Sequence, residues 1–413
     1  MSEFSINTNL GALAALQSLD ATQQALNNTQ NIVSTGQLVS SASDNPAIYS
    51  IAQTMNANIA GLTAVQDNIS FAQSVLGVAS SAASQISSQL AFLQQTVTQG
   101  QQTGISASTM NSQIQNILNN INNFANNATF NGVNLLASTG TAGVQFTSLT
   151  IQDSINAGGT LSINSMLGTG ITNMVQQLNL TNLSVQSGGV QFSFNSSYAP
   201  KAGDYLQISN GTNNWVFEFQ TSGATPVAAP SGYTLGSNAT GGQNYLTNVM
   251  ISSTSSPMAA VGALITSLQQ QGFGAALDSS GNLTVLGNNL QQSGTAWEAT
   301  GTAYAATNTT NEAGVTQTAL SGGQAAISIV QSAISSMNNV SSIIGATQQE
   351  LTGMANFSSS LSTSLTEGVG ALTDANMAAE SAQLTALQTK QQLAIRTLSI
   401  ANAQPQVLLN LFQ

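Results

Sequence analysis

The stretch "VQSAISSMNNVSSIIGATQQEL", residues 330–351, carries an apolar side chain at every seventh position. These positions are occupied by Val330, Met337, Ile344 and Leu351. Ser358 interrupts the series, which resumes at Leu365 and Leu372. A seven-residue repeat sustained over this length is typical of helices that pack as a coiled coil. The stretch therefore predicts a long helix that packs along at least one partner helix, and few charged residues flank it to select that partner by ion pairing.

The first 140 residues have a similar helical pattern, which predicts partners for this helix. Apolar residues recur at intervals of three and four, the period of a helix face, with Ala72 filling one gap: Ile51, Met55, Ile59, Leu62, Val65, Ile69 and Leu76. A second stripe follows at Ile114, Ile117, Ile121 and Phe124. Between the first residues and these stripes, Asp44-Asn45-Pro46 combines a turn signal with a helix start. We therefore expect separate helices before and after this tripeptide.

The middle of the chain, from about 141 to 320, predicts β-structure instead. Segments such as "GDYLQISNGTNNWVFEFQTSG", residues 203–223, alternate apolar and polar residues between turn signals, which is typical of strands and hairpins. One amphipathic helix is expected around "PMAAVGALITSLQQQG", residues 257–272. A small core is predicted from the aromatic residues Phe192, Phe194, Tyr205, Trp215, Phe217 and Phe219.

The predicted fold class is mainly α with a β-rich insert (α+β), because helical ends enclose a β-rich middle. Long helices at the two ends of the chain can pack together only if they lie side by side, so we expect a paired coiled-coil stalk that carries the insert as an outer domain. The expected segments are a terminal helix, an N-terminal stalk, the insert, a C-terminal stalk and a second terminal helix, at 1–42, 43–140, 141–320, 321–368 and 369–413.

The composition argues against several classes of function. Charged residues make up 4% of the chain, against roughly 25% in ordinary globular proteins. The net charge is −11, and the three cations are Lys201, Lys390 and Arg396. Binding to nucleic acid requires a basic face that neutralises phosphates, and an anionic membrane surface also attracts cations. We therefore expect no nucleic-acid partner and no membrane insertion, since no apolar run approaches the ~20 residues of a span either.

The residue types that carry most enzyme chemistry are scarce or missing. The sequence contains no cysteine and no histidine, which removes thiol nucleophiles, the commonest general base and the commonest zinc ligand. The acidic residues of the insert are scattered and show no metal-site or acid–base spacing: Asp153, Asp204, Glu218 and Asp278. The sequence predicts no catalytic residue, no cofactor and no metal site.

The last sixteen residues, "LSIANAQPQVLLNLFQ", are unusually apolar for the end of a chain, where polar residues are usual. An isolated helix of this length is only marginally stable in water, so we expect other subunits to cover it. The first residues, "MSEFSINTNL", lack the basic and apolar regions of a secretory signal peptide. If the protein is exported, we expect a route that uses no cleaved signal.

Four segments resemble the bacterial flagellins, the subunits of the flagellar filament, and particularly those of alphaproteobacteria. They occur in the family's order: "INTNLGALAALQSL" (6–19), "VSTGQLVSSASDNPAIYSIA" (33–52), "ATFNGVNLL" (128–136) and "LTDANMAAESAQLTALQTKQQLAIRTLSIANAQPQVLLNLFQ" (372–413). Each motif alone is weak, but the four in this order are highly specific. The resemblance covers both ends of the chain, whereas the central insert varies within the family.

The resemblance implies a structural subunit that polymerises into the extracellular flagellar filament for swimming motility, without catalysis. It implies that the terminal helices form the inner core of a helical homopolymer, and that they fold on assembly. The residues expected to pack between subunits are Leu10, Leu13, Leu16, Leu398, Ile400, Val407, Leu408, Leu411 and Phe412. Hook-filament junction proteins, the filament cap and an export chaperone are further expected partners.

Two alternative functions remain open at this stage. The chain could be a hook-filament junction protein of the same family, which shares the terminal helices. It could also be a filament subunit whose insert binds glycans as an adhesin. A third possibility, a zinc peptidase carried in the insert, requires a His-Glu-x-x-His motif. The absence of histidine excludes that motif.

Overall fold

The computed structural model of the chain describes residues 9–411, apart from 103, 156–158, 186–187, 195–203, 222–235, 238–242, 253–256, 279–280, 288–289, 297–314 and 321. The chain divides into two compact units. The first contains Met1–Ile69, Gln152–Gly159 and Gly353–Gln413, and the second contains Ser70–Ile151 and Thr160–Thr352.

The first unit is built from four helical segments. They are α1 (Leu10–Thr35), the first part of α2 (Pro46–Gln99), the last part of α6 (Gly322–Thr373) and α7 (Met377–Leu411). Helix α1 ends at Gly36, whose positive φ of 72° suits glycine and whose N–H donates to the Ile32 carbonyl at 2.8 Å.

The predicted helix start at Asp44-Asn45-Pro46 is confirmed. Pro46 is the first residue of α2, where its missing N–H costs no helical hydrogen bond. The Asn45 side-chain oxygen accepts from the N–H groups of Ala47 and Ile48, each at 3.2 Å. The Asp44 carboxylate accepts from the N–H groups of Ser41 at 2.8 Å and Ser40 at 3.0 Å. These backbone hydrogen bonds hold the pKa of the Asp44 carboxyl below its usual value.

Helices α2, α3 (Ala107–Asn127) and α6 bury most of the stripes that the sequence predicts. In α2 the stripe is buried from Leu62 onward, whereas Ile51 is 47% exposed. The heptad residues of α6 are at most 1% exposed: Val330, Met337, Ile344 and Leu351. Ile114 and Ile121 of α3 are fully buried. The turn after α3 is closed by the buried Asn134, whose side-chain amide donates to the Ala125 carbonyl at 2.8 Å. The motif at 128–136 therefore ends a helix by satisfying its free carbonyls.

The β-rich part of the second unit contains two larger sheets and one pair of strands. The pair is β1 (Leu149–Gln152) with β2 (Thr160–Ile163). One sheet has the order β10-β4-β5-β7-β6, from Gln291–Ala296, Tyr205–Ser209, Asn214–Thr221, Gln243–Ile251 and Gly236–Ser237. The other has the order β11-β3-β9-β8, from Val315–Leu320, Gly189–Phe194, Leu283–Leu286 and Gly274–Leu277. Within the two larger sheets, the strand pairs are antiparallel except β5 with β7, which is parallel.

Both larger sheets share one apolar core with helix α5 (Pro257–Gln270). Short helix α4 (Met174–Gln177) lies outside this core. Alternation along β5 sends Phe217 and Phe219 into the core, where both are fully buried with Phe192. Trp215 is partly buried against the core and stacks on Tyr245 at a ring-centroid distance of 5.5 Å. Of the predicted aromatic core, Tyr205 is 9% exposed and the side chain of Phe194 lies outside the described residues.

The predicted fold class is therefore confirmed, with long helices at both ends of the chain and a β-rich middle. The five-segment division of the chain stays a prediction.

Candidate functional site

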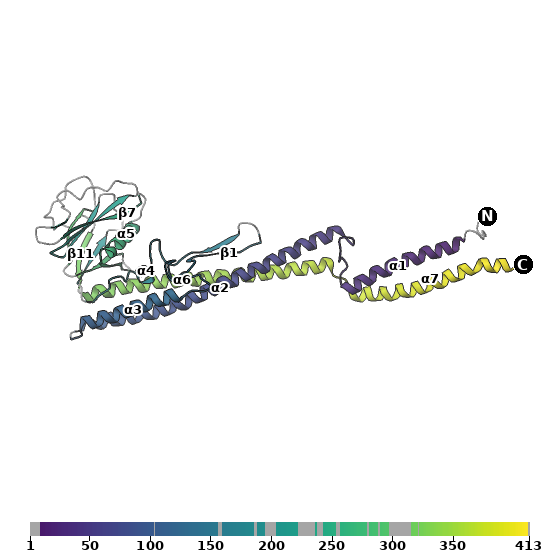
Figure 1. The fold of residues 1–413 in the computed structure, drawn as a ribbon, viewed down its shortest axis with the longest axis horizontal. Helices are drawn as coiled ribbons and strands as arrows, with labels where there is room; N and C mark the ends of the chain where they lie inside the picture. The colour runs from purple at the N-terminus through teal and green to yellow at the C-terminus, as the bar shows by residue number, and fades with distance from the viewer. Residues whose placement is uncertain are drawn as a thin grey trace. The chain divides into compact units, whose positions relative to one another are not determined.

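Helices α1 and α7 of the first unit lie side by side along their lengths (Figure 1). Among the described side chains, two hydrogen bonds join α7 to α1 and its N-cap residue. The side-chain amide of Gln391 donates to the side-chain oxygen of Gln23. The side-chain amide of Asn9 donates to the backbone carbonyl of Ala401 at 2.7 Å. The pairing predicted for the helical ends of the chain is thus formed within one subunit.

A backbone junction, residues 36–38 with 373–375, closes one end of this pair. The N–H of Leu38 donates to the Thr373 carbonyl at 2.6 Å, and the N–H of Ala375 donates to the Gly36 carbonyl at 3.0 Å. Gln37 and Asp374 form an antiparallel bridge between the two segments. This junction fixes where α7 begins relative to the end of α1.

Helix α1 buries only part of its length. Its buried residues, Thr22, Leu26, Thr29 and Ile32, follow a helical period near the junction. Leu10 and Leu13 are 59% exposed, and Leu16 is 46% exposed. These three leucines line an open groove of about 640 Å³ along α1, whose one charged lining residue is Asp20. The half of α1 far from the junction therefore presents aliphatic side chains to solvent.

Helix α7 is exposed in the same way. Among its described side chains, Ala394 is the buried hydrophobic one, at 9% exposure. Leu393 and Ile400 are about two-thirds exposed, and Ile395 is half exposed. A helix with apolar residues at so many surface positions is incompletely buried within its own chain.

The structure places the nine predicted packing residues in three groups. Leu10, Leu13, Leu16 and Ile400 are exposed, and Leu398 is half-buried. Val407, Leu408 and Leu411 lie in the backbone path of α7, with side chains outside the described residues, and Phe412 also lies outside them. Their packing role stays a prediction.

Sequence reasoning missed Leu393 and Ile395, although both are at least as exposed as Leu16. A signal was available for Leu393, because it precedes Ile400 by seven residues and so shares its face of the helix. No sequence signal identifies Ile395, because periodicity alone does not distinguish a helix face that the same chain covers from a helix face that another chain covers.

The ionisable groups of the described residues form no reactive constellation. No group of three or more His, Cys, Asp or Glu side chains there could hold a metal ion. Helix α1 carries one charged residue, Asp20, and α7 carries Glu380, Lys390 and Arg396. In the part of the chain that is described, no helix combines the length and hydropathy of a membrane span.

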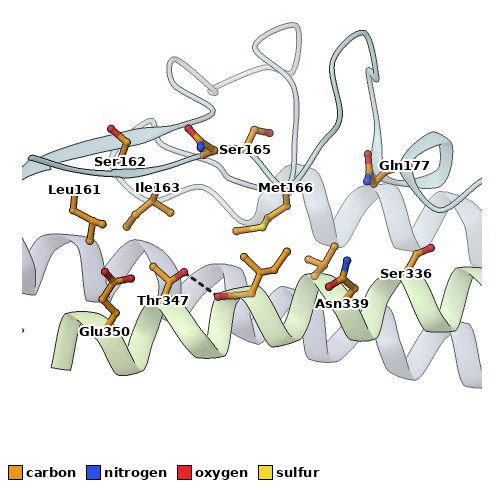
Figure 2. A pocket seen from close by; sticks show the side chains of 13 residues that line it. Leu161, Ser162, Ile163, Ser165, Met166, Gln177, Ser336, Asn339, Thr347 and Glu350 are labelled. Carbon is orange, nitrogen blue, oxygen red and sulfur yellow. Dashed lines mark hydrogen bonds between the residues drawn. The ribbon is translucent and has the colours of Figure 1, made fainter. Parts of the chain in front are cut away.

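A second cavity, of about 470 Å³, lies in the second unit between α6 and the segment 161–166 (Figure 2). Leu161, Ile163 and Met166 point from this segment toward α6. Glu350 is the one charged residue of its lining. Its lining holds hydroxyl groups, including that of Thr347, but no histidine, lysine or second carboxylate beside Glu350, so it offers no general acid–base pair.

Comparison with known protein families gives two matches, one at each helical end. The family model described as the bacterial flagellin N-terminal helical region matches residues 6–141. The model described as the bacterial flagellin C-terminal helical region matches residues 327–412. Together they cover more than half of the chain. The chain belongs to the flagellin family.

Several flagellins are similar to this chain. Flagellin A of Rhizobium meliloti is 27% identical over 447 aligned positions, which cover 99% of this chain and all of that protein. Flagellin FljO of Caulobacter vibrioides is 36% identical over 140 residues, 33% of this chain and 51% of FljO. The chain thus spans about half the length of the Caulobacter relatives that it matches.

A weaker similarity links the fold to a crystal structure of Xanthomonas campestris FlgL. It covers 76% of this chain and 99% of that one, at 12% identity and a TM-score of 0.35. This similarity is too low to support a functional conclusion. The two flagellin helical regions contain α1, α2, α3, most of α6 and α7, so the exposed α1 and α7 faces belong to the part that is typical of the family.

Proposed function

We propose that this flagellin is a structural subunit that polymerises into the bacterial flagellar filament used for swimming motility. The observation that carries the proposal is the exposed aliphatic surface of α1 and α7, which lies within the family's two helical regions. The named relatives support it, because flagellins from Rhizobium and Caulobacter share these regions.

The exposed aliphatic surface of α1 and α7 would gain free energy if another molecule covered it. Burying one aliphatic side chain contributes about 1.5–3 kcal/mol relative to leaving it in water. Leu10, Leu13 and Ile400 are each more than half exposed, so most of that free energy is not realised within one chain. A copy that packs against a different surface of the next copy extends into a helical polymer unless the rotation closes a ring. A second copy of this chain is therefore the occupant we propose.

The low content of charged residues limits which contacts can form between copies of the chain. Three cations cannot neutralise fourteen acidic residues, so an ion-pair network between subunits is not available. The net charge of −11 adds repulsion between copies. Association must therefore rest on aliphatic burial and on hydrogen bonds of amides and hydroxyls. We propose that the nine predicted packing residues, together with Leu393 and Ile395, make these contacts.

The proposed function also includes an export route, partner proteins and a role without catalysis. The filament location implies export, and we propose a route without a cleaved signal peptide. Hook-filament junction proteins, a filament cap and an export chaperone are the proposed partners by family resemblance. We propose a purely structural role without catalysis, in keeping with the absence of histidine and cysteine from the sequence.

Electron microscopy of the purified full-length protein tests the proposal. We expect long helical filaments, first from seeds and then at rising protein concentration. A matched control replaces Leu13 by Asp, which puts a charge into the α1 groove without touching a buried residue. If the natural chain stays monomeric under seeding, the polymer function is wrong. A junction protein would instead bind at filament or hook ends without growing.

A further inference from the structure

Pro405 lies inside helix α7. In an α-helix each backbone carbonyl accepts a hydrogen bond from the N–H four residues later. Proline has no N–H, so the carbonyl of Ala401 has no helical donor. Each carbonyl of the preceding turn, residues 397 to 400, has a non-proline residue four positions later, which can supply a backbone N–H. Ala401 therefore marks the first carbonyl along α7 that the sequence leaves open.

The donor that reaches this carbonyl comes from the other end of the chain. The side-chain amide nitrogen of Asn9 lies 2.7 Å from the Ala401 oxygen, across 392 residues of sequence. The side-chain oxygen of the same Asn9 accepts from the N–H of Ala12 at 3.0 Å and so caps α1. One amide group thus satisfies a free N–H of α1 and a free carbonyl of α7.

We propose that Asn9 is a positioning residue that sets the register of α1 against α7, and that Pro405 makes this register unique. If the helices slid by one residue toward lower numbers of α7, Asn9 would meet a carbonyl already bonded within the helix. The donor would then lose its partner, and the Ala401 carbonyl would lose its donor. The asparagine amide carries its capping oxygen and its N–H donors on separate atoms, whereas serine has one shorter hydroxyl for both roles.

The other contacts between α1 and α7 leave the register at the far end of the pair unfixed. A network of salt bridges cannot set the register, because α1 carries a single charged residue, Asp20. The junction at residues 36–38 fixes the near end of the pair, and Gln23 contacts Gln391 between the two ends. Beyond Gln23, the α1 surface consists mainly of leucine and alanine, which tolerate sliding. Asn9 therefore supplies the polar contact at the far end of the pair.

A double-mutant cycle tests the coupling between Asn9 and Pro405. Asn9→Ser keeps a good N-cap but is too short to reach Ala401. Pro405→Ala returns an N–H to the Ala401 carbonyl. We expect Asn9→Ser to speed amide hydrogen exchange in the first turns of α1 and around Ala401 about fivefold in the natural background, the size of one net hydrogen bond. In the Pro405→Ala background the increase should be less than twofold.

Equal effects of Asn9→Ser in both backgrounds would overturn the proposal, because they would mean that water satisfies Ala401 and that Asn9 acts as a cap alone. The exchange is measured on the full-length chain in sedimented filaments. If the natural chain gives no sediment, the polymer function fails on that result alone, and the same cycle is then measured on the soluble chain.

A measurement at two pH values distinguishes the hydrogen-bond donor role of Asn9 from its capping role. Asn9→Asp keeps the capping oxygen and the shape of the side chain but replaces the donor by an acceptor at neutral pH. A protonated Asp regains one O–H donor below its ordinary pKa of about 3.9. We expect exchange protection near Ala401 to fall about tenfold at pH 7 and to return toward the natural value near pH 3. A loss that stays the same at both pH values would count against the donor role.

Discussion

Phenylalanines of the central sheets and leucines of α1 are similarly apolar but occupy opposite environments. Phe192, Phe217 and Phe219 are fully buried between two sheets and α5. Leu10 and Leu13 are 59% exposed on a helix that has one partner within the chain. The β-rich part completes its core from its own residues, whereas the helix pair α1 and α7 leaves several aliphatic side chains exposed. Stability and assembly can therefore be changed separately, which the following predictions test.

The largest expected effect is on assembly. Deleting residues 399–413 removes Ile400 and the apolar end of α7 but no residue of the central core. Loss of several aliphatic contacts at about 1.5–3 kcal/mol each should raise the critical concentration for polymerisation more than about a hundredfold. Sedimentation measures polymer, and thermal unfolding of the β-rich part serves as the control. Normal filaments from the shortened chain would show that the α7 end is dispensable.

The next effect is on the central core. Phe217→Ala removes a fully buried ring and should lower the free energy of unfolding of the β-rich part by about 3–5 kcal/mol. Trp215, which lies edge-on to Phe273, offers a fluorescence signal for denaturant unfolding. The matched control is Phe357→Ala on α6, where the ring is 70% exposed and the change should stay within about 0.5 kcal/mol. A Phe217→Ala chain with an unchanged midpoint would contradict the core assignment.

A smaller effect is expected at Glu218, which points away from Phe217 on the other face of β5. Its side chain is 2% exposed, and one carboxylate oxygen has no hydrogen-bond partner. Burial raises the pKa of this carboxyl, and the nearby side-chain amide of Gln220 opposes the shift. The ionised form is thus disfavoured in the folded state. Stability should rise as the pH falls through the raised pKa, and level off below the unfolded value of about 4.3.

Glu218→Gln tests this sign. The variant keeps the shape and removes the buried charge, so it should stabilise the β-rich part at pH 7 by about 1 kcal/mol and flatten the pH profile. Asp278→Asn is the matched control, because the Asp278 carboxylate accepts from the N–H and the side-chain amide of Asn282, each at 2.8 Å. That change should destabilise instead. A Glu218→Gln variant less stable than the natural chain at pH 7 would refute the assignment.

The smallest effect should be that of salt on the polymer. Exposed ion pairs weaken as ionic strength rises, but aliphatic and amide contacts do not. With three cations in the chain, preformed filaments should release little monomer between about 0.05 and 0.5 M salt, and should persist to about pH 4. Sedimentation across both ranges gives the measurement. Monomer released at high salt or near pH 5 would reveal carboxylate salt bridges between subunits.

Much of the helical architecture could be predicted because helix burial follows a short sequence period. The α6 seam is buried where the heptads place it, and α2 begins at Pro46. Ser358, interpreted as an interruption, is only 3% exposed, and its hydroxyl lies 3.5 Å from the Leu62 carbonyl. The period thus located a buried position even where the residue is polar, since a backbone acceptor is close.

Contacts between distant segments could not be predicted in the same way. The junction of Leu38 with Thr373 and the parallel pairing of β5 with β7 depend on how remote segments meet, which no local pattern encodes. The hydrogen bond from Asn9 to Ala401 was equally hidden, although the lack of an N–H at Pro405 is visible in the sequence. At the candidate surface, the sequence identified aliphatic residues, but not which of them the chain itself would cover.

The pairing of α1 with α7 also has a consequence for biosynthesis. A ribosome adds about 5–20 residues per second, so tens of seconds separate the synthesis of α1 from that of its partner. The junction at Gly36 and Ala375 forms only after nearly the whole chain has been made. A chain that stops early carries the leucines of α1 but can never form the pair. Only finished chains therefore contain both helices of the paired surface.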